Sequence, residues 1–235
     1  MMKYLISIFP KGISTYSEEM DNLFWFITIL VSIAFVISLY ILLRPLVLNH
    51  YKKVSKAAYF TGEDKKHFRW IVIAMALLAA SDFAILLVEH PTWAKIEQEI
   101  PNPDFHVAVI GRQWNWIFQY PGEDGKLYTA DDVVVDEQNS ELHVPVNKNV
   151  VVDLKAKDVV HSFFIPELRL KQDNVPGRTI KRWFNATVEG KYDLACAEIC
   201  GVLHTNMRNF LVVESQEKND LYLKNLYEKK VTNKQ

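Results

Sequence analysis

The chain of 235 residues lacks any excess of charge of one sign and is poor in cysteine. It carries 27 Lys and Arg against 28 Asp and Glu, a formal net charge of -1, so no overall basicity indicates a nucleic-acid partner. It also lacks internal repeats and low-complexity tracts, and therefore does not read as a repeat protein. Cys196 and Cys200 are its only two cysteines, so the function of these two thiols becomes the central question.

Both cysteines lie in a segment rich in metal-binding side chains. The segment Cys196-Ala-Glu-Ile-Cys200-Gly-Val-Leu-His204-Thr-Asn-Met207 holds two thiols, one imidazole and one thioether. A second imidazole, His161, follows an apolar, strand-like run. Thiolates and thioethers are soft ligands that suit copper, whereas imidazole suits copper and zinc alike.

Two other interpretations of this segment remain open from the residues alone. Cysteines four residues apart can form a disulfide in a tight loop, and an oxidising compartment would favour it. Two Cys and two His can also hold a structural zinc ion. Neither interpretation uses Met207, and a thioether is a common weak axial ligand of copper, so the residue set favours copper.

The pattern Cys-x-Glu-x-Cys-x3-His-x2-Met, preceded by a lone His, resembles the binuclear copper site, CuA, of cytochrome c oxidase subunit II. The resemblance implies six ligands for two copper ions: bridging thiolates of Cys196 and Cys200, capping imidazoles of His161 and His204, and weak axial ligands from Met207 and the backbone carbonyl of Glu198. It further implies that the Glu198 side chain binds a magnesium ion at the boundary with subunit I.

Two apolar runs predict membrane-spanning helices. Leu23–Leu43 carries no charge, and Trp70–Val88 is interrupted only by Ser81 and Asp82. Each is long enough to cross a hydrocarbon core of about 30 Å at about 1.5 Å per residue. Asp82 either faces a partner or water inside the membrane or reaches the interface.

The segment between the two runs is rich in lysine. By the positive-inside rule it stays in the cytoplasm, so both termini and the cysteine-bearing domain are expected in the periplasm. The family often has a glutamate just before the second span, at the mouth of a proton path. Glu63 lies too far before Trp70 to be matched to that glutamate.

The second half of the chain predicts a different architecture. Short β-branched and aromatic runs, separated by Gly, Pro, Asn and Asp, are typical of an antiparallel sandwich or barrel. With the resemblance, the fold class is two N-terminal transmembrane helices followed by an all-β, cupredoxin-like Greek-key domain. The expected parts are an uncleaved extracytoplasmic tail (1–22), the first span (23–48), a cytoplasmic loop (49–68), the second span (69–90), a linker (91–103), the CuA domain (104–215) and a terminal amphipathic helix and tail (216–235).

An aromatic run starts at Gly111 and reads Gly-Arg-Gln-Trp-Asn-Trp-Ile-Phe-Gln-Tyr. Its alternation predicts one strand, Arg112–Tyr120, with its four aromatic side chains on one face. The run is similar to the family segment Gly-His-Gln-Trp-Tyr-Trp, in which the first Trp accepts electrons from cytochrome c. The resemblance assigns that role to Trp114, although Arg112 and Asn115 depart from the family pattern.

Each of two loops can be interpreted either as a solvated surface or as a contact surface for a partner. Residues 123–141 hold seven acidic residues against Lys126, so they form either a solvated surface or a docking surface for a basic cytochrome c. A calcium loop at Asp124–Asp132 is disfavoured because the EF-hand pattern is missing. Residues 165–178 read as a turn-rich loop, which in the family faces subunit I.

The expected function follows from the resemblance. The chain would be a subunit of a proton-translocating cytochrome c oxidase that takes electrons from cytochrome c and passes them to haem in subunit I, where oxygen is reduced. Its partners would be subunits I and III, further subunits, membrane lipid and a separate donor, since no Cys-x-x-Cys-His haem site is present. A CuA subunit of a nitric oxide reductase and a membrane-anchored copper-delivery protein are the alternatives, and a quinol oxidase subunit is disfavoured because that branch lacks these ligands.

Overall fold

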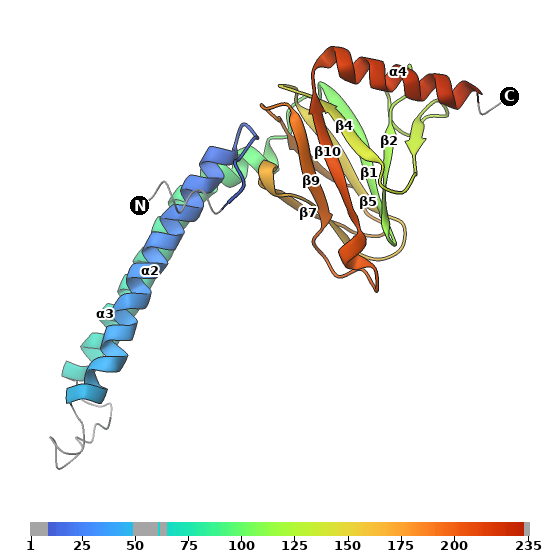
Figure 1. Cartoon of the computed structure of the whole chain (residues 1–235). Coiled ribbons are helices and arrows are strands. Elements are labelled where there is room, and N and C mark those ends of the chain that lie inside the picture. The colour runs from blue at the N-terminus through green and yellow to red at the C-terminus, as the bar shows by residue number, and fades with distance from the viewer. Residues whose placement is uncertain (1–8, 49–60, 62–64, 233–235) are drawn as a thin grey trace. The chain divides into compact units, whose positions relative to one another are not determined.

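The computed structural model describes residues 9–48, 61 and 65–232, which form two compact units (Figure 1). One unit is Glu19–Ala94, and the other comprises Met1–Glu18 together with Lys95–Gln235. The greater part of the predicted cytoplasmic loop, including Glu63 and three of its lysines, lies outside the described residues.

The helical unit contains the two predicted spans. Helix α2 covers Ser17–Leu48 and α3 covers Lys65–Trp93, so both extend beyond the predicted ranges of 23–48 and 69–90. Both helices are long and apolar enough to cross a membrane, and their apolar side chains are exposed along the helix length. The hydroxyl of Ser81, which interrupts the second apolar run, donates to the carbonyl of Leu78 at 2.7 Å and so adds no unsatisfied polar group.

The second unit is built from ten strands in two five-stranded sheets. The strands are β1 (Phe105–Arg112), β2 (Asn115–Tyr120), β3 (Val133–Val135), β4 (Glu141–Pro145), β5 (Val150–Ala156), β6 (His161–Ile165), β7 (Leu170–Asn174), β8 (Ile180–Phe184), β9 (Gly190–Cys196) and β10 (Arg208–Glu214). The first sheet has the order β3-β2-β1-β5-β8 and the second β4-β10-β9-β6-β7. Each sheet contains one parallel pair, β1 with β5 and β4 with β10, so the sandwich is mixed and not purely antiparallel.

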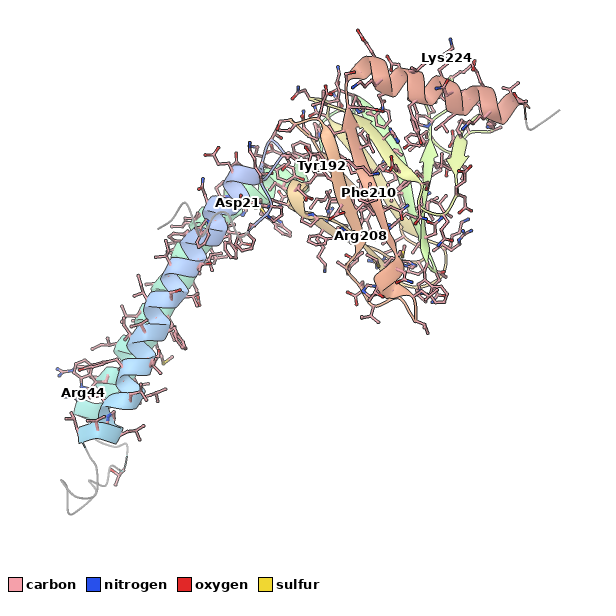
Figure 2. All side chains as sticks on the ribbon, in the orientation of Figure 1. Asp21, Arg44, Tyr192, Arg208, Phe210 and Lys224 are labelled. Atoms are coloured by element: carbon pink, nitrogen blue, oxygen red, sulfur yellow. The ribbon has the colours of Figure 1, made fainter. Side chains whose placement is uncertain are left out.

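Strand alternation places the core between the two sheets. Along β10, Asn209, Leu211 and Val213 are buried, whereas Arg208 and Phe210 project from the other face, on which they are visible in Figure 2. This is the period of two that a half-buried strand requires. The result is a cupredoxin-like β-sandwich, as the fold class predicted.

Two segments differ from the predicted strands. The expected strand Arg112–Tyr120 is two strands, because Gln113 and Trp114 form a turn between β1 and β2. Within residues 165–178, the expected loop contains β7 (Leu170–Asn174). β7 lies at the edge of its sheet, where polar side chains face solvent, so its sequence carries little apolar alternation.

The tail before α2 is part of the β-sandwich unit. Ile13 and Tyr16 are buried, with Tyr16 fully enclosed and edge-on to Trp183 at 5.5 Å between ring centroids. The N–H of Ile13 donates to the carbonyl of Glu167, and its own carbonyl accepts from the N–H of Thr187, both at 2.8 Å. These residues therefore complete the packing of the domain and are not a free extension.

The C-terminal helix α4 (Gln216–Thr232) follows β10 and crosses the end of the sandwich opposite the β9–β10 loop (Figure 1). Tyr222 stacks on the ring of His143 at 3.7 Å, and the hydroxyl of Tyr227 donates to the carbonyl of Pro121 at 2.8 Å. The predicted terminal amphipathic helix is present, and Lys224 on its outer face points away from the sheets (Figure 2).

A buried carboxylate stabilises the first sheet away from the cysteines. Asp153 on β5 is 2% exposed and accepts hydrogen bonds from His106 at 3.0 Å, the Tyr128 hydroxyl at 2.8 Å and Lys181 at 3.1 Å. Burial raises the pKa of Asp153, but these three donors outweigh it and hold the pKa well below its usual range.

Candidate metal centre

Strand pairing assembles the site at one end of the second sheet. His161 is the first residue of β6, Cys196 is the last residue of β9, and the ladder between these strands pairs Phe163 with Cys196. The loop from β9 to β10 carries the rest of the motif, and the Cys196 N–H closes its base by donating to the Met207 carbonyl at 3.1 Å. A histidine 35 residues before Cys196 is thereby brought beside both thiols.

The two thiols are close to one another but are not linked. Their Sγ atoms are 3.8 Å apart, well beyond the disulfide bond length of about 2.05 Å, so both cysteines are free. Nδ1 of His161 lies 4.0 Å from Sγ of Cys196, and the ligand atoms of His161, Cys196 and Cys200 all lie within 4.8 Å of one another. The Glu198 carbonyl oxygen lies 3.3 Å from the same sulfur of Cys196.

The remaining predicted ligands surround the second thiol. Nδ1 of His204 is 3.5 Å from Sγ of Cys200, and Sδ of Met207 is 3.9 Å from it. The 3-10 turn η3 (His204–Asn206) places this imidazole, and Met207 follows it directly with only 1% of its surface exposed. A buried thioether directed at a thiol is a soft donor that zinc does not ordinarily use, so the donor set fits copper better than zinc.

Hydrogen bonds and charge give the two thiols different pKa values when no metal is bound. Burial raises the pKa of Cys196, but hydrogen bonds from His161 and from the neighbouring backbone lower it to about 6. Burial and the adjacent Cys196 thiolate raise the pKa of Cys200 to about 12. The pair thus favours one thiolate and one thiol, and a bound cation would be needed to hold both as thiolates.

Asp158 fixes the ring of His161. Its Oδ1 lies 2.8 Å from Nε2 of His161, which leaves Nδ1 facing Cys196. A carboxylate on the outer nitrogen of a metal-binding histidine selects the tautomer and the ring orientation. Burial lowers the pKa of His161, but the hydrogen bonds and negative charge of Cys196 and Asp158 raise it overall.

Two glycines allow the ligand loops to approach so closely. A methyl group on the α-carbon of Gly111 would lie 2.8 Å from two atoms of the His161 ring, so this ring packs directly on β1. Gly201, after Cys200, has a φ of +124°, which side-chain-bearing residues rarely adopt. Gly111 begins the aromatic run and Gly201 follows Cys200 in the cysteine segment. Their steric role depends on segments distant in sequence, so the sequence alone did not predict it.

The turn between β1 and β2 brings Trp114 to the cysteine loop. A methyl group on Gly201 would lie 3.1 Å from Nε1 of Trp114, so the edge of the indole contacts the loop beside Cys200. Trp114 is half-buried, unlike Trp116 and Phe118, which are fully enclosed in the core. Of the four aromatic side chains in this run, Trp114 alone lies outside the strand, and its surface is partly accessible.

The acidic segment does not present a uniform negative surface. Asp132 is 7% exposed and accepts hydrogen bonds from the backbone N–H of Tyr128 at 2.6 Å and from Thr129 at 2.9 Å. Asp136 forms a two-fold ion pair with Arg112 at 2.8 and 2.9 Å. Local structure and an ion pair therefore engage two of the carboxylates that were candidates for donor docking.

Comparisons with known proteins point to one family. Residues 105–216 match the family described as cytochrome c oxidase subunit II, periplasmic domain. The chain is 34% identical to the alternative cytochrome c oxidase subunit 2 of Bradyrhizobium diazoefficiens over 71% of its length, and it spans 65% of that relative.

A second relative extends through the helical unit. The cytochrome c oxidase subunit 2 of Cereibacter sphaeroides is 28% identical over 89% of this chain and 76% of its own length. The crystal structure of the periplasmic domain of cytochrome oxidase subunit II of Bradyrhizobium japonicum aligns with a TM-score of 0.49 and 29% identity, over 56% of this chain and 99% of that one. Residues 105–216 therefore match the cytochrome c oxidase subunit II family, and the two subunit 2 relatives carry the similarity beyond this domain.

Proposed function

We propose that this chain is the electron-accepting subunit of a haem–copper cytochrome c oxidase, a proton-translocating complex in which oxygen is reduced in subunit I. The observation that carries the proposal is the cluster of two thiols, two imidazoles and one thioether at the end of the β-sandwich, in which all but the half-buried His204 are buried. Copper held there supplies a one-electron carrier, and soft sulfur ligands suit its two oxidation states.

The proposed ligands divide between two copper ions. Cys196 and Cys200, whose sulfurs lie 3.8 Å apart, would supply thiolates to both ions. His161 lies beside the first thiol and His204 beside the second, which suits one capping imidazole for each ion. Met207, whose Sδ lies 3.9 Å from Sγ of Cys200, would supply a weak thioether ligand on that side.

Glu198 has two proposed roles through different atoms. Its backbone carbonyl, 3.3 Å from Sγ of Cys196, completes the copper ligands. Its half-buried carboxylate is a hard oxygen ligand and would bind magnesium at the boundary with subunit I.

Electrons would enter from a separate cytochrome c at Trp114. The indole reaches solvent on one side and contacts the backbone beside Cys200 on the other. The exposed acidic residues of the 123–141 segment, such as Glu123, would contribute to steering a basic donor towards this surface.

The proposed location is a bacterial inner membrane, crossed twice. Helices α2 and α3 supply the two spans, and the lysines between them would keep that loop in the cytoplasm, so the copper domain would lie in the periplasm. Subunits I and III and lipid would be its partners, with residues 165–178 facing subunit I.

The number of copper ions provides the decisive test. The full chain, purified in detergent and loaded with copper, is examined by electron paramagnetic resonance. One unpaired electron shared equally by two coppers gives seven hyperfine lines, whereas a single copper gives four. A four-line spectrum at full loading would refute the binuclear site.

A further inference from the structure

Gln113, the residue before Trp114, connects the turn between β1 and β2 to the cysteine loop. Its side-chain Nε2 donates to the carbonyl oxygen of Cys200 at 2.8 Å. Its backbone N–H donates to Oδ2 of Asp158 at 2.7 Å, and the other oxygen of this carboxylate lies 2.8 Å from Nε2 of His161. One residue is therefore tethered to two of the segments that hold the candidate metal ligands.

The indole of Trp114 lies near the Gln113 carboxamide and has no hydrogen bond of its own among the described residues. Within the described part of the chain, its Nε1 is buried without a hydrogen-bond partner. Its known close neighbour is Gly201, at which a methyl group would lie 3.0 Å from Nε2 of Gln113 and 3.1 Å from Nε1 of Trp114. The carboxamide of Gln113 and the edge of the indole thus lie side by side on the same glycine.

Gln113 is not needed to fill the core, because its side chain is exposed. An exposed glutamine ordinarily loses its rotamer freedom only if a contact repays the loss, and this one is held by a backbone carbonyl of a candidate metal ligand. The hydrogen bond therefore serves the geometry of the turn more than the stability of the sandwich.

We propose that Gln113 is a positioning residue, whose carboxamide holds the indole of Trp114 against the backbone at Cys200 and Gly201. This inference rests on the proposed function for its kinetic consequence, since Trp114 is the residue at which electrons would enter. The placement of the indole itself is independent of any donor and of any metal.

The test compares the full chain in detergent with Gln113→Met, which keeps the length of the side chain and removes the donor. The matched control is Gln216→Met on α4, because Gln216 is also exposed and also donates from its Nε2, to Oδ1 of Asp220 at 2.8 Å. Each protein is loaded with copper and reduced in a stopped-flow instrument, by ferrous cytochrome c or by dithionite.

Gln113→Met should lower the limiting rate of reduction by cytochrome c at saturating donor by up to about tenfold, the shift that loss of one neutral hydrogen bond allows. The donor concentration at half-saturation, the rate with dithionite and the copper spectrum should remain unchanged. Gln216→Met should match the wild type in all four measurements. A changed copper spectrum in Gln113→Met would mean that the residue acts on the metal ligands, and it would overturn the assignment.

A second measurement needs neither copper nor donor. Fluorine NMR of the metal-free chain labelled with fluorotryptophan reports the indoles directly, and Trp114→Phe identifies the signal of Trp114. That signal should shift and narrow in Gln113→Met but not in Gln216→Met, because the indole gains freedom. An unaltered signal would overturn the positioning role. A shifted signal in a chain that cytochrome c does not reduce would support positioning and refute the proposed function instead.

Discussion

Gly111→Ala should damage the copper site while leaving the β-sandwich folded. The added methyl group would lie 2.8 Å from Cδ2 and Cγ of His161 and 3.0 Å from its Cβ. Ordinary contacts between carbon atoms begin at about 3.5 Å, so the ring must move by about 0.7 Å or the strand must yield. His161 has no free space on its own side, because it is completely buried and held by Asp158.

The displacement of the ring should affect metal binding much more than it affects the stability of the domain. Overpacking of this kind costs about 1–3 kcal/mol, which a domain of this size can survive. Metal–ligand distances tolerate only about 0.2 Å, so a displacement of about 0.7 Å removes His161 as a ligand of normal geometry. We therefore expect the variant to lose copper or to show an altered visible and paramagnetic spectrum.

The matched control for this prediction is Gly177→Ala. Gly177 has a φ of +75° and no atom within 4 Å of the position of an added methyl group, so alanine is strained there by about 1–2 kcal/mol but touches nothing. Copper content, spectrum and thermal unfolding are measured for both variants in the full chain. Similar losses of stability with a changed spectrum only in Gly111→Ala are expected. A wild-type spectrum with two coppers in Gly111→Ala would refute the argument.

Four further outcomes are expected. Cys196→Ser should abolish the binuclear spectrum and Met207→Leu should only perturb it, because a bridging thiolate binds both ions and an axial thioether binds weakly; equal copper-to-protein ratios in the two variants would contradict this. Asp153→Asn should destabilise the chain by about 2–3 kcal/mol at neutral pH. The folded pKa of Asp153 is lowered, so its contribution is present above the unfolded pKa of about 3.9 and is lost as pH falls through the folded value; a deficit in thermal unfolding that persists at the lowest pH would count against it. Tyr16→Ala should cost about 3–5 kcal/mol in thermal unfolding, because a fully buried ring is removed from the domain, and an unchanged melting temperature would show that the tail does not pack there. Glu198→Gln should leave the copper spectrum of the isolated chain near normal. In the assembled oxidase, with manganese substituted for magnesium as a paramagnetic probe, the same change should weaken the manganese signal. A wild-type manganese signal would exclude the side-chain role while leaving the carbonyl role intact.

Local sequence determined the spans, most strands and much of the metal-binding pattern. A run of about 20 apolar residues has few ways to satisfy its backbone other than as a helix, and alternation with a period of two predicts a strand face. The proposed ligands from Cys196 to Met207 lie on one loop, so their spacing was informative without knowledge of the fold. Their assignment to copper came from the softness of the donors and from resemblance to a family.

Tertiary structure decided which distant groups meet this loop. Pairing of β6 with β9 brings His161 to the cysteines, and the closeness of Gly111 to its ring arises from packing between the two sheets. The turn at Gln113 interrupts an alternating pattern that, read alone, predicted a continuous strand with Trp114 on the same face as Trp116. The sequence also did not show which acidic residues are exposed, because the burial of Asp132 among local hydrogen-bond donors depends on the fold. Contacts between segments far apart in the chain are fixed by packing and hydrogen bonding over the whole domain. A sequence pattern within one segment therefore does not predict them.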